Sequence, residues 1–437
     1  MQRRSCLPLP QEIYVNIFRC LSDEEKGNIR ATSRLFKQLI DQPALWKKST
    51  VVLKKITGYN ADFWELLRKR RIKCVVMRKG NAKCLKKLLL ELPGLTALTF
   101  DGCSKINMLQ LPCKFQSLNK LAFKNCHPSF PIQDIASVLQ ITHLTLCSFV
   151  EPFPCAEQMA TLVSLKNLRS LALHNYCRDP NGCLLQSALF EFHNLKELSL
   201  KEKPFSMVLH PDFFTPPSIT KSDRKEKQTK YDSRLHLEKL EILGSNNVTL
   251  SEESLNQLSS VNSLTLHYDH QKNSLEKCEM VTILKNLPNL KELRVKGGWS
   301  FSKYAHSIPP SLEALHLCRV AIGNKELEYL ARQRAGLKHL HLDYCSFTEE
   351  WYPDELPDNF PCLKTLSIRH CKITVDQFRD LAKLKHLEML DIVDICLFPT
   401  NCLQKSVQEF RILTDHRVQV VQHPGSREQI PCDCSAC

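Results

Sequence analysis

Glycine is scarce in this chain, which has 12 glycines among 437 residues. Nucleotide-binding folds use glycine in the tight turns around phosphate groups, and the sequence contains neither G-x-G-x-x-G nor G-x-x-x-x-G-K-S/T. No apolar stretch reaches the roughly 18 residues that a membrane-spanning helix requires. The apolar core of a signal peptide is also missing near the start, because Glu12, Arg19 and acidic residues 23–25 interrupt it. We therefore expect neither a nucleotide-dependent enzyme nor a membrane or secreted protein.

Motifs for catalysis and metal binding are absent from the sequence as well. No cysteine or serine lies in a recognisable nucleophile motif, and H-E-x-x-H does not occur. The chain has 21 cysteines, but a disulfide framework is expected in small secreted chains rather than in one of this length. The sequence therefore predicts a cytoplasmic and/or nuclear protein with reduced thiols, no catalytic residues, no metal and no cofactor.

Positive charge is concentrated at one end of the chain. The net charge is +14, and residues 1–90 contain 21 basic and 7 acidic residues, whereas the remainder contains 39 of each. The densest basic run extends from Arg68 to Lys73. This run is compatible with a solvated face, a nuclear-import signal or a nucleic-acid contact. It lacks the interleaved aromatic residues of a single-strand binder, so nucleic acid is the weakest of the three interpretations.

A leucine template, L-x-x-L-x-L, recurs along most of the chain. Successive matches begin 22 to 29 residues apart, with one gap of 42, and this period indicates a leucine-rich-repeat solenoid. Each repeat is expected to contribute one short strand, and the strands to stack as a parallel sheet on the concave face of a curved α/β array. The twelve matches begin at Leu95, Leu118, Ile141, Leu168, Leu195, Leu237, Val261, Leu290, Leu312, Leu337, Leu363 and Leu387, and Ile72 begins a weaker thirteenth.

Four cysteines occupy one position of the repeat. Cys103, Cys126, Cys345 and Cys371 each lie three residues past the last template residue. A free cysteine behaves as a small apolar side chain, so we expect these thiols to fill buried space rather than to react or bind metal.

Side chains between the template leucines are expected to face the concave surface. In the N-terminal half they are small or mixed, as at Thr99 and Ser199, whereas the C-terminal half is rich in arginine, histidine and tyrosine. Such side chains on a rigid sheet are typical of recognition of an acidic or phosphorylated protein segment, and the histidines predict pH-sensitive binding. Asp343 lies among these residues, and Trp299 lies just beyond one strand. The alternative is an ordinary solvated face, because concave positions must be polar whether or not they bind a partner. The candidate substrate-binding residues are Arg294, Lys296, His316, Arg319, His341, Tyr344, Arg369 and His370.

The segment from Leu9 to Trp46 predicts short helices in front of the repeats. Pro10 suits a first helical turn, and Ser22 with Glu25 forms a capping-box pattern that begins a second helix. So small a unit needs a neighbour to cover its apolar residues. These residues are Ile13, Ile17, Phe18 and Leu21 on the first helix, Ile29 and Phe36 on the second, and Leu39 and Ile40 on a third short segment.

This ordered set of residues resembles an F-box, the motif that docks onto the Skp adaptor of a cullin–RING ubiquitin ligase. The sequence differs from the usual pattern at Lys26-Gly27, where an apolar pair is common, and at Phe36, where tryptophan is common. The resemblance implies that the adaptor contact is made by Leu9, Pro10, Ile13, Ile17, Phe18, Leu45 and Trp46.

The resulting domain prediction has four parts. Residues 5–50 form the F-box, 51–71 a linker and cap, 72–415 the repeats, and 416–437 a C-terminal tail. The long gap at 203–234 contains a proline pair and many polar residues, and it predicts an exposed inserted loop in which Ser218, Thr220 and Ser222 are accessible.

The resemblance implies a non-catalytic substrate-recognition subunit of an SCF-type ligase. Its expected partners are the Skp adaptor, through it the cullin–RING ligase, and a protein substrate of unknown identity; neither nucleic acid nor membrane is expected. Two alternatives remain open. One is an interaction scaffold without ligase coupling, and the other is a nucleic-acid-binding protein that uses the basic run from Arg68 to Lys73.

Overall fold

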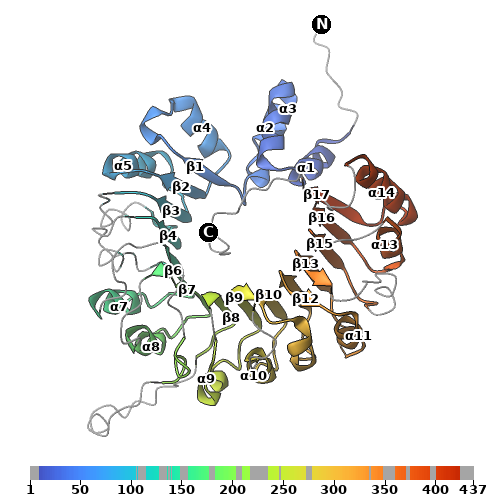
Figure 1. Cartoon of the computed structure of the whole chain (residues 1–437). Helices are drawn as coiled ribbons and strands as arrows, with labels where there is room; N and C mark the ends of the chain where they lie inside the picture. Colours follow the sequence, from blue (N-terminus) through green and yellow to red (C-terminus); the bar gives the residue numbers. More distant parts are fainter. Residues whose placement is uncertain are drawn as a thin grey trace, which may run out of the picture. The chain divides into compact units, whose positions relative to one another are not determined.

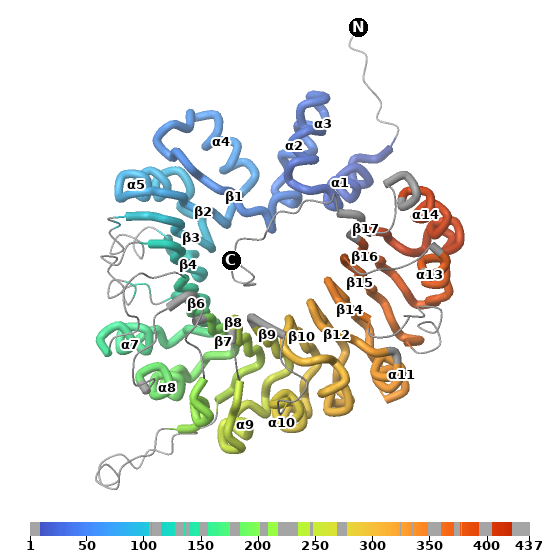
Figure 2. The backbone as a smooth tube through the Cα atoms, in the orientation of Figure 1, coloured from blue at the N-terminus to red at the C-terminus, as the bar shows by residue number. Residues whose placement is uncertain are grey.

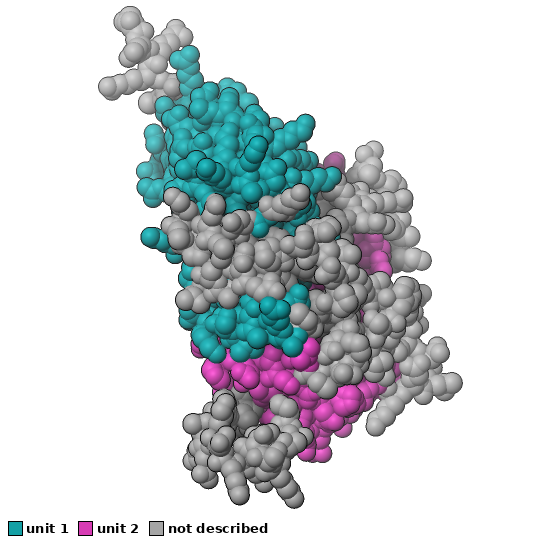
Figure 3. Space-filling model, turned by 90° about the vertical axis from the view of Figure 1, so that its left-hand side faces the viewer, with its two compact units in different colours: residues 1–172, 176–179 teal, residues 173–175, 180–437 magenta. Residues whose placement is uncertain are grey.

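The computed structural model of the chain forms two compact units. Residues 1–172 and 176–179 make up unit 1, and residues 173–175 and 180–437 make up unit 2 (Figure 3). Each unit has its own buried leucine core. The structure describes residues 9–104, 106, 115–126, 135, 138, 140–147, 156–176, 183–202, 209–216, 235–245, 248–271, 278–333, 336–347, 360–370, 375–393 and 400–423.

Unit 1 begins with a helical module. The Ser22 hydroxyl accepts a hydrogen bond from the backbone N–H of Glu25 at 3.2 Å, and the Glu25 carboxylate accepts one from the N–H of Ser22 at 2.7 Å. This confirms the capping box. The Ser33 hydroxyl caps the next helix by accepting a hydrogen bond from the N–H of Phe36. Phe36 therefore lies on the third helix, whereas the sequence analysis placed it on the second. The elements are α1 (Gln11–Arg19), α2 (Asp23–Thr32), α3 (Arg34–Ile40) and the 3-10 turn η1 (Pro43–Leu45).

The rest of unit 1 alternates strands with return segments. The strands β1 (Thr50–Leu53), β2 (Cys74–Arg78), β3 (Ala97–Asp101), β4 (Lys120–Lys124) and β5 (His143–Cys147) pair in parallel in that order. Their return segments include η2 (Ile56–Gly58), α4 (Ala61–Lys69), α5 (Ala82–Glu91) and α7 (Ala156–Val163), and β6 (Ser170–Tyr176) crosses the unit boundary.

Unit 2 repeats the same arrangement. Its strands lie on the inner side of the unit and its helices on the outer side, as the ribbon and the backbone tube both show (Figures 1 and 2). The strands β7 (Glu197–Glu202), β8 (Lys239–Ser245), β9 (Ser263–Gln271), β10 (Glu292–Gly298), β11 (Ala314–Cys318), β13 (His339–Asp343), β15 (Thr365–Arg369), β16 (Met389–Val393) and β17 (Gln419–His423) pair in parallel in that order.

Shorter elements complete unit 2. The strands β12 (Ala321–Ile322) and β14 (Ser346–Phe347) form a separate parallel pair. The return segments are α8 (Cys183–Leu189), α9 (Glu252–Gln257), α10 (Met280–Lys285), η6 (Phe301–Lys303), η7 (Ala305–Ser307), α11 (Asn324–Gln333), α13 (Val375–Asp380), η9 (Leu381–Lys383) and α14 (Thr400–Leu413).

The template leucines hold the strands in register. In unit 2, Leu293, Leu315 and Leu340 are direct partners on β10, β11 and β13, and each is at most 1 % exposed. Burial of one such side chain contributes about 1.5–3 kcal/mol to the free energy of unfolding. A shift of the strand register by one residue would expose every template leucine of that strand to solvent. The predicted leucine-rich repeats and their parallel sheet are therefore confirmed.

The repeat sheet extends past both predicted limits. β1 pairs with β2 although it lies before residue 72, in the stretch assigned to a linker and cap. β17 pairs with β16, although residues 416–437 were expected to form a tail. β1 lies in the stretch predicted as a linker and cap and is compatible with a cap, whereas β17 corrects the predicted tail over residues 419–423. Both outermost strands lack the full leucine template.

The predicted inserted loop contains a packed segment. Within 203–234 the structure describes residues 209–216, where Phe214 is fully buried and its N–H donates to the hydroxyl of Ser254 at 3.2 Å. The Gln186 side chain also donates to the carbonyls of Asp212 and Thr215. The prediction of an exposed loop is therefore wrong for 209–216, and Ser218, Thr220 and Ser222 lie outside the described residues.

Candidate functional site

Four of the seven predicted adaptor-binding residues lie on the surface of the helical module. Pro10 is exposed at the start of α1, and Leu9, Ile13 and Ile17 are 42 %, 43 % and 46 % exposed. Ile13 and Ile17 are spaced by four and lie on one side of α1. Leu9 precedes the helix, next to the N-cap residue Pro10. We call Leu9, Ile13 and Ile17 the α1 stripe.

The other three residues belong to the interior of the module. Phe18, Leu45 and Trp46 are 3 %, 5 % and 6 % exposed. The ring of Phe18 packs edge-on against Phe36, with 5.6 Å between centroids. These side chains offer little surface to a partner, so the structure assigns them to the core instead of to a direct adaptor contact.

The departure from the F-box pattern at Lys26-Gly27 is accommodated by packing. Lys26 is 6 % exposed, and its ammonium group lies 3.1 Å from the carboxylate of Asp23 and 5.5 Å from the centroid of the Trp46 ring. The methylenes of a lysine can cover apolar surface while its charge finds a partner. Lys26 thus takes the buried place that an apolar residue would occupy.

A buried carboxylate joins the helical module to the first repeats. Asp41 is 1 % exposed and accepts hydrogen bonds from Arg30 at 2.8 Å and from Arg70, the residue that ends α4, at 2.7 Å. The Arg70 guanidinium also stacks on Trp46, 3.7 Å from the ring centroid. We call Arg30, Asp41, Trp46 and Arg70 the Asp41 clamp.

The Asp41 clamp keeps its carboxylate ionised. Burial by itself raises the pKa of Asp41, but the hydrogen bonds and positive charges of Arg30 and Arg70 outweigh burial and hold the pKa below its ordinary value. The sequence analysis missed Asp41 and Arg30, because the partners lie 11 and 29 residues apart and no local pattern connects them.

The clamp also changes the interpretation of the basic run. Arg70 is held by Asp41, and Arg68 forms an ion pair with Glu91 at 2.6 Å. An import signal or a nucleic-acid contact needs its charges free, and two members of this run are already neutralised within unit 1. Both interpretations therefore lose support.

Polar residues form a continuous row on the inner face of unit 2. Strand pairing places Arg294 beside His316, and His316 beside His341. The same register continues to Ser367 and then to Asp391. The structure thus brings three of the predicted substrate-binding residues into direct succession.

Two of the predicted arginines on this face are paired with acidic residues. Arg294 lies 2.6 Å from Glu292, which is also 3.5 Å from the ring of His316. Arg369 donates to Asp391, with its Nε at 3.2 Å. Arg294 and Arg369 are therefore compensated, and Glu292 and Asp391 are the residues that the sequence analysis overlooked.

Burial lowers the pKa of both histidines in the row. Burial, followed by the charge of Arg294, lowers the pKa of His316 to about 4. Burial and then Arg369 likewise lower the pKa of His341. A lowered pKa favours the neutral ring at pH 7, which argues against the expected pH-sensitive role near neutral pH for these two histidines.

Two further candidates lie at the carboxyl ends of the strands. Tyr344 is 51 % exposed, and its ring stacks on that of His370 at 3.9 Å between centroids. The Nδ1 of His370 lies 3.0 Å from the carboxylate of Asp343. Trp299, in contrast, is buried against Tyr268 and belongs to the core.

A serine and a histidine approach each other on the inner face without forming a catalytic pair. His174 Nε2 lies 2.9 Å from the hydroxyl of Ser199, which donates its own proton to Glu241 at 2.7 Å. A nucleophilic serine must instead give its proton to the histidine. His174 is fully buried, and Glu241 is also paired with Lys239. The arrangement is that of a buried polar chain.

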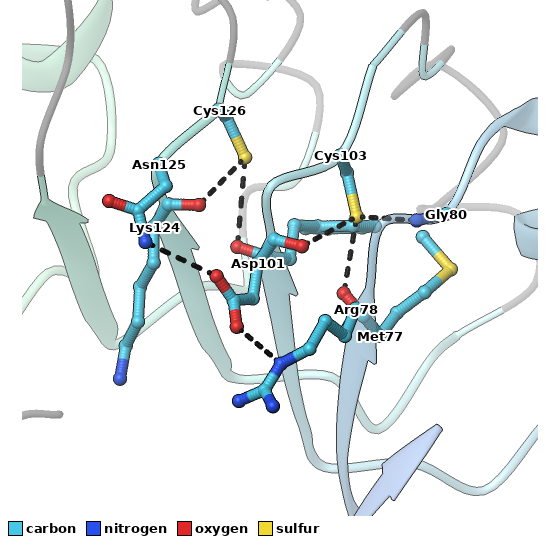
Figure 4. A network of polar contacts seen from close by, with 9 residues as sticks. Met77, Arg78, Gly80, Asp101, Cys103, Lys124, Asn125 and Cys126 are labelled. Atoms are coloured by element: carbon cyan, nitrogen blue, oxygen red, sulfur yellow. Dashed lines mark hydrogen bonds and ion pairs between the residues drawn. The ribbon is translucent and has the colours of Figure 1, made fainter. Parts of the chain in front are cut away.

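The repeat cysteines bind backbone groups of the neighbouring repeat. The thiol of Cys103 donates to the carbonyl of Met77 at 3.1 Å and accepts from the N–H of Gly80, as Figure 4 shows. Cys126 makes the corresponding bond to Phe100. Burial raises the pKa of Cys103 to about 11, so Cys103, Cys126 and the similarly buried Cys345 are structural, whereas Cys371 lies outside the described residues.

Two searches of the described residues gave no site. No helix among them is both long and apolar enough to cross a membrane. The described part of the chain also contains no group of three His, Cys, Asp or Glu side chains that could hold a metal ion.

Comparisons with known proteins identify the N-terminal module. Residues 7–51 match the sequence model of the F-box-like family. None of the curated protein sequences matches the chain. The chain therefore carries an F-box-like domain in front of its leucine-rich repeats.

Two solved structures show low similarity to the chain. TLR13, from a TLR13–ssRNA13 complex, is 17 % identical with a TM-score of 0.42 over 74 % of this chain and 47 % of its own. An internalin from Listeria monocytogenes is 15 % identical with a TM-score of 0.37 over 89 % of this chain and 98 % of its own. The chain thus spans about half the length of TLR13.

Proposed function

We propose that this chain is a substrate-recognition subunit of an SCF-type ubiquitin ligase and has no catalytic residues of its own. The F-box-like domain binds the Skp adaptor, and through it a cullin–RING ligase, while the repeats bind a protein substrate. The chain then promotes ubiquitin transfer by proximity, because it raises the effective concentration of a substrate lysine near the charged conjugating enzyme. In this role the protein would act in the cytoplasm or the nucleus.

One observation carries the proposal. The α1 stripe leaves three apolar side chains partly exposed, two of them one turn apart on α1 and the third just before it, within the segment that matches the F-box-like family. Single exposed apolar residues are common, but a row of them on one helix is typical of a surface that docks against a partner. The stripe stands beside a repeat array, which is an architecture suited to a second, independent partner.

The proposal predicts that aspartate in the α1 stripe abolishes adaptor binding. We expect the double variant Ile13→Asp with Ile17→Asp to lose retention of purified Skp adaptor, since two carboxylates would be desolvated at the interface. Both side chains are exposed, so the variant should fold with an unchanged circular dichroism spectrum. Phe18 is unsuitable for this test because its substitution would disrupt the module core.

Leu90 provides the matched control. It is 70 % exposed on α5, outside the F-box-like domain, and Leu90→Asp places the same charge on the same unit. Leu90→Asp should bind the adaptor as the unmodified chain does. Full adaptor retention by the folded Ile13/Ile17 variant, or no retention by the unmodified chain, would contradict the proposal.

A further inference from the structure

The residue that follows a strand has a left-handed backbone in several repeats of both units. In unit 1 these residues are Lys79, Gly102 and Asn125, with φ of 51°, 61° and 52°. In unit 2 they are Arg319, Tyr344 and His370, with φ of 54°, 50° and 53°. Each comes directly after the last residue of its strand, after β2, β3 and β4 in unit 1 and after β11, β13 and β15 in unit 2.

A backbone hydrogen bond to the next strand accompanies this conformation. The N–H of Arg319 donates to the carbonyl of Asp343 at 2.8 Å, and the N–H of Tyr344 donates to the carbonyl of Arg369 at 3.0 Å. The same bond joins Gly102 to Lys124 at 2.8 Å. The left-handed turn is therefore a requirement of the repeat, whatever side chain stands there.

The choice of side chain at this position differs between the units. Unit 1 has glycine and asparagine, which adopt the left-handed region readily, at two of these positions and Lys79 at the third. At three such positions unit 2 places arginine, tyrosine and histidine, and the first two adopt this region at a cost in backbone strain. In unit 2 these residues follow strands that are direct neighbours in the sheet, so their side chains can meet on one surface.

The three side chains form one stacked column. The guanidinium carbon of Arg319 lies 5.6 Å from the centroid of the Tyr344 ring. Tyr344 and His370 stack at 3.9 Å with an angle of 6° between their planes. A carboxylate oxygen can only accept, so His370 donates from Nδ1 to Asp343, and this bond orients the ring at the end of the column.

Arg319 is the cation of this column that can pair with a carboxylate of a partner. Arg294 is paired with Glu292, and Arg369 with Asp391. Among the described residues, no carboxylate lies within ion-pair distance of the exposed Arg319 side chain. Its guanidinium is held over an aromatic ring, which leaves it ordered and able to form two parallel hydrogen bonds to one carboxylate.

The surrounding charge favours a carboxylate over a phosphate. A phosphate dianion is usually held by more than one cation, and here Asp343 stands beside the column with its own negative charge. A single carboxylate needs only the one guanidinium. The half-exposed Tyr344 ring provides flat apolar surface for the residue next to that carboxylate.

We propose that the column of Arg319, Tyr344 and His370 is a docking surface for an acidic peptide segment of a partner protein. The partner's Asp or Glu pairs with Arg319, and its neighbouring side chain packs on Tyr344. This inference rests on the proposed function, because it names the class of substrate segment that the repeats would bind.

The test uses short peptides on an immobilised array, probed with the purified full chain. Each peptide has a central Asp or Glu in randomised neutral flanks, beside matched peptides with Asn, Gln or phosphoserine at the centre. We expect preferential binding to Asp and Glu peptides. Arg319→Gln should lower that binding about tenfold, the usual effect of losing a hydrogen-bonded charge pair.

Two variants separate recognition from folding. Asparagine suits the left-handed backbone, so Tyr344→Asn should leave the melting temperature unchanged while it weakens peptide binding. If the tyrosine were purely structural, its replacement would not weaken peptide binding at an unchanged melting temperature. Lys79→Gln removes a charge from the equivalent position of unit 1 and should bind peptides normally.

Several results would overturn the inference. They are the absence of any preference for Asp and Glu peptides, stronger binding to phosphoserine peptides, and a preference that survives Arg319→Gln or Tyr344→Asn. Adaptor binding by the same preparations is measured in parallel. Retained adaptor binding without peptide preference removes this inference alone, whereas loss of adaptor binding removes the proposed function.

Discussion

At the scale of single residues, Lys26 and Gly27 have opposite effects on α2. Lys26 is buried and paired, whereas Gly27 is exposed in the middle of the helix. A helical glycine costs about 0.5–1 kcal/mol relative to alanine, because it loses more backbone freedom on folding. A Cβ built at Gly27 would meet no atom within 4 Å. The glycine therefore weakens the helix without serving its packing.

Replacement of Gly27 by alanine should stabilise the chain. We expect Gly27→Ala to raise the free energy of unfolding of the F-box-like domain by about 0.5–1 kcal/mol, measured by chemical denaturation. Gly298→Ala is the contrasting variant. Its backbone is left-handed at φ 78°, and a Cβ would lie 2.5 Å from the Tyr268 ring, so it should destabilise unit 2. A lower stability for Gly27→Ala would show that the glycine is needed for packing.

At the scale of elements, the sequence predicts interior repeats better than terminal ones. Interior strands must match a neighbour on each side, so their leucines recur at fixed positions, as Leu293, Leu315 and Leu340 do. A terminal strand has one strand neighbour among the described residues and can vary its apolar residues. β1 and β17 were missed for this reason.

β17 should be required for the stability of unit 2. Val418 and Val420 are buried, and the Arg417 guanidinium donates to the carbonyls of Leu387 and Leu384. A chain truncated after Thr414 loses these contacts, whereas one truncated after His423 keeps them. We expect the shorter chain to unfold at a lower temperature in calorimetry. Equal unfolding temperatures would mean that β17 contributes nothing to the array.

At the scale of the whole molecule, the sequence gives the types of surface residue but not their ionic state. Arginines and histidines were correctly expected on the inner face of unit 2, yet Arg369 is neutralised by Asp391, a residue 22 positions away. Asp41 and Arg70 are 29 positions apart. Such pairs follow from strand register and helix packing, which a single sequence does not specify. The residue types on this face could therefore be predicted from the sequence, but their ion pairs could not.

The Asp41 clamp connects the F-box-like domain to the first repeats of unit 1. Removal of one partner from a buried ion pair costs about 3–5 kcal/mol, because the other charge is left without compensation. We expect Asp41→Asn to destabilise the chain by about 3 kcal/mol at pH 7 in chemical denaturation. Arg68→Gln, which breaks the exposed pair with Glu91, is the matched control and should cost at most about 1 kcal/mol.

The contribution of Asp41 should also depend on pH in a defined direction. Its folded-state pKa lies below the unfolded value of about 3.9, so the folded chain binds fewer protons there. The stabilisation is fully present above about pH 5 and is lost as the pH falls through the folded-state pKa. The stability difference between the unmodified chain and Asp41→Asn should therefore be constant from pH 7 to 5 and shrink towards pH 3. A difference that stayed the same at pH 3 would mean that the ionised carboxylate is not what holds the two parts together.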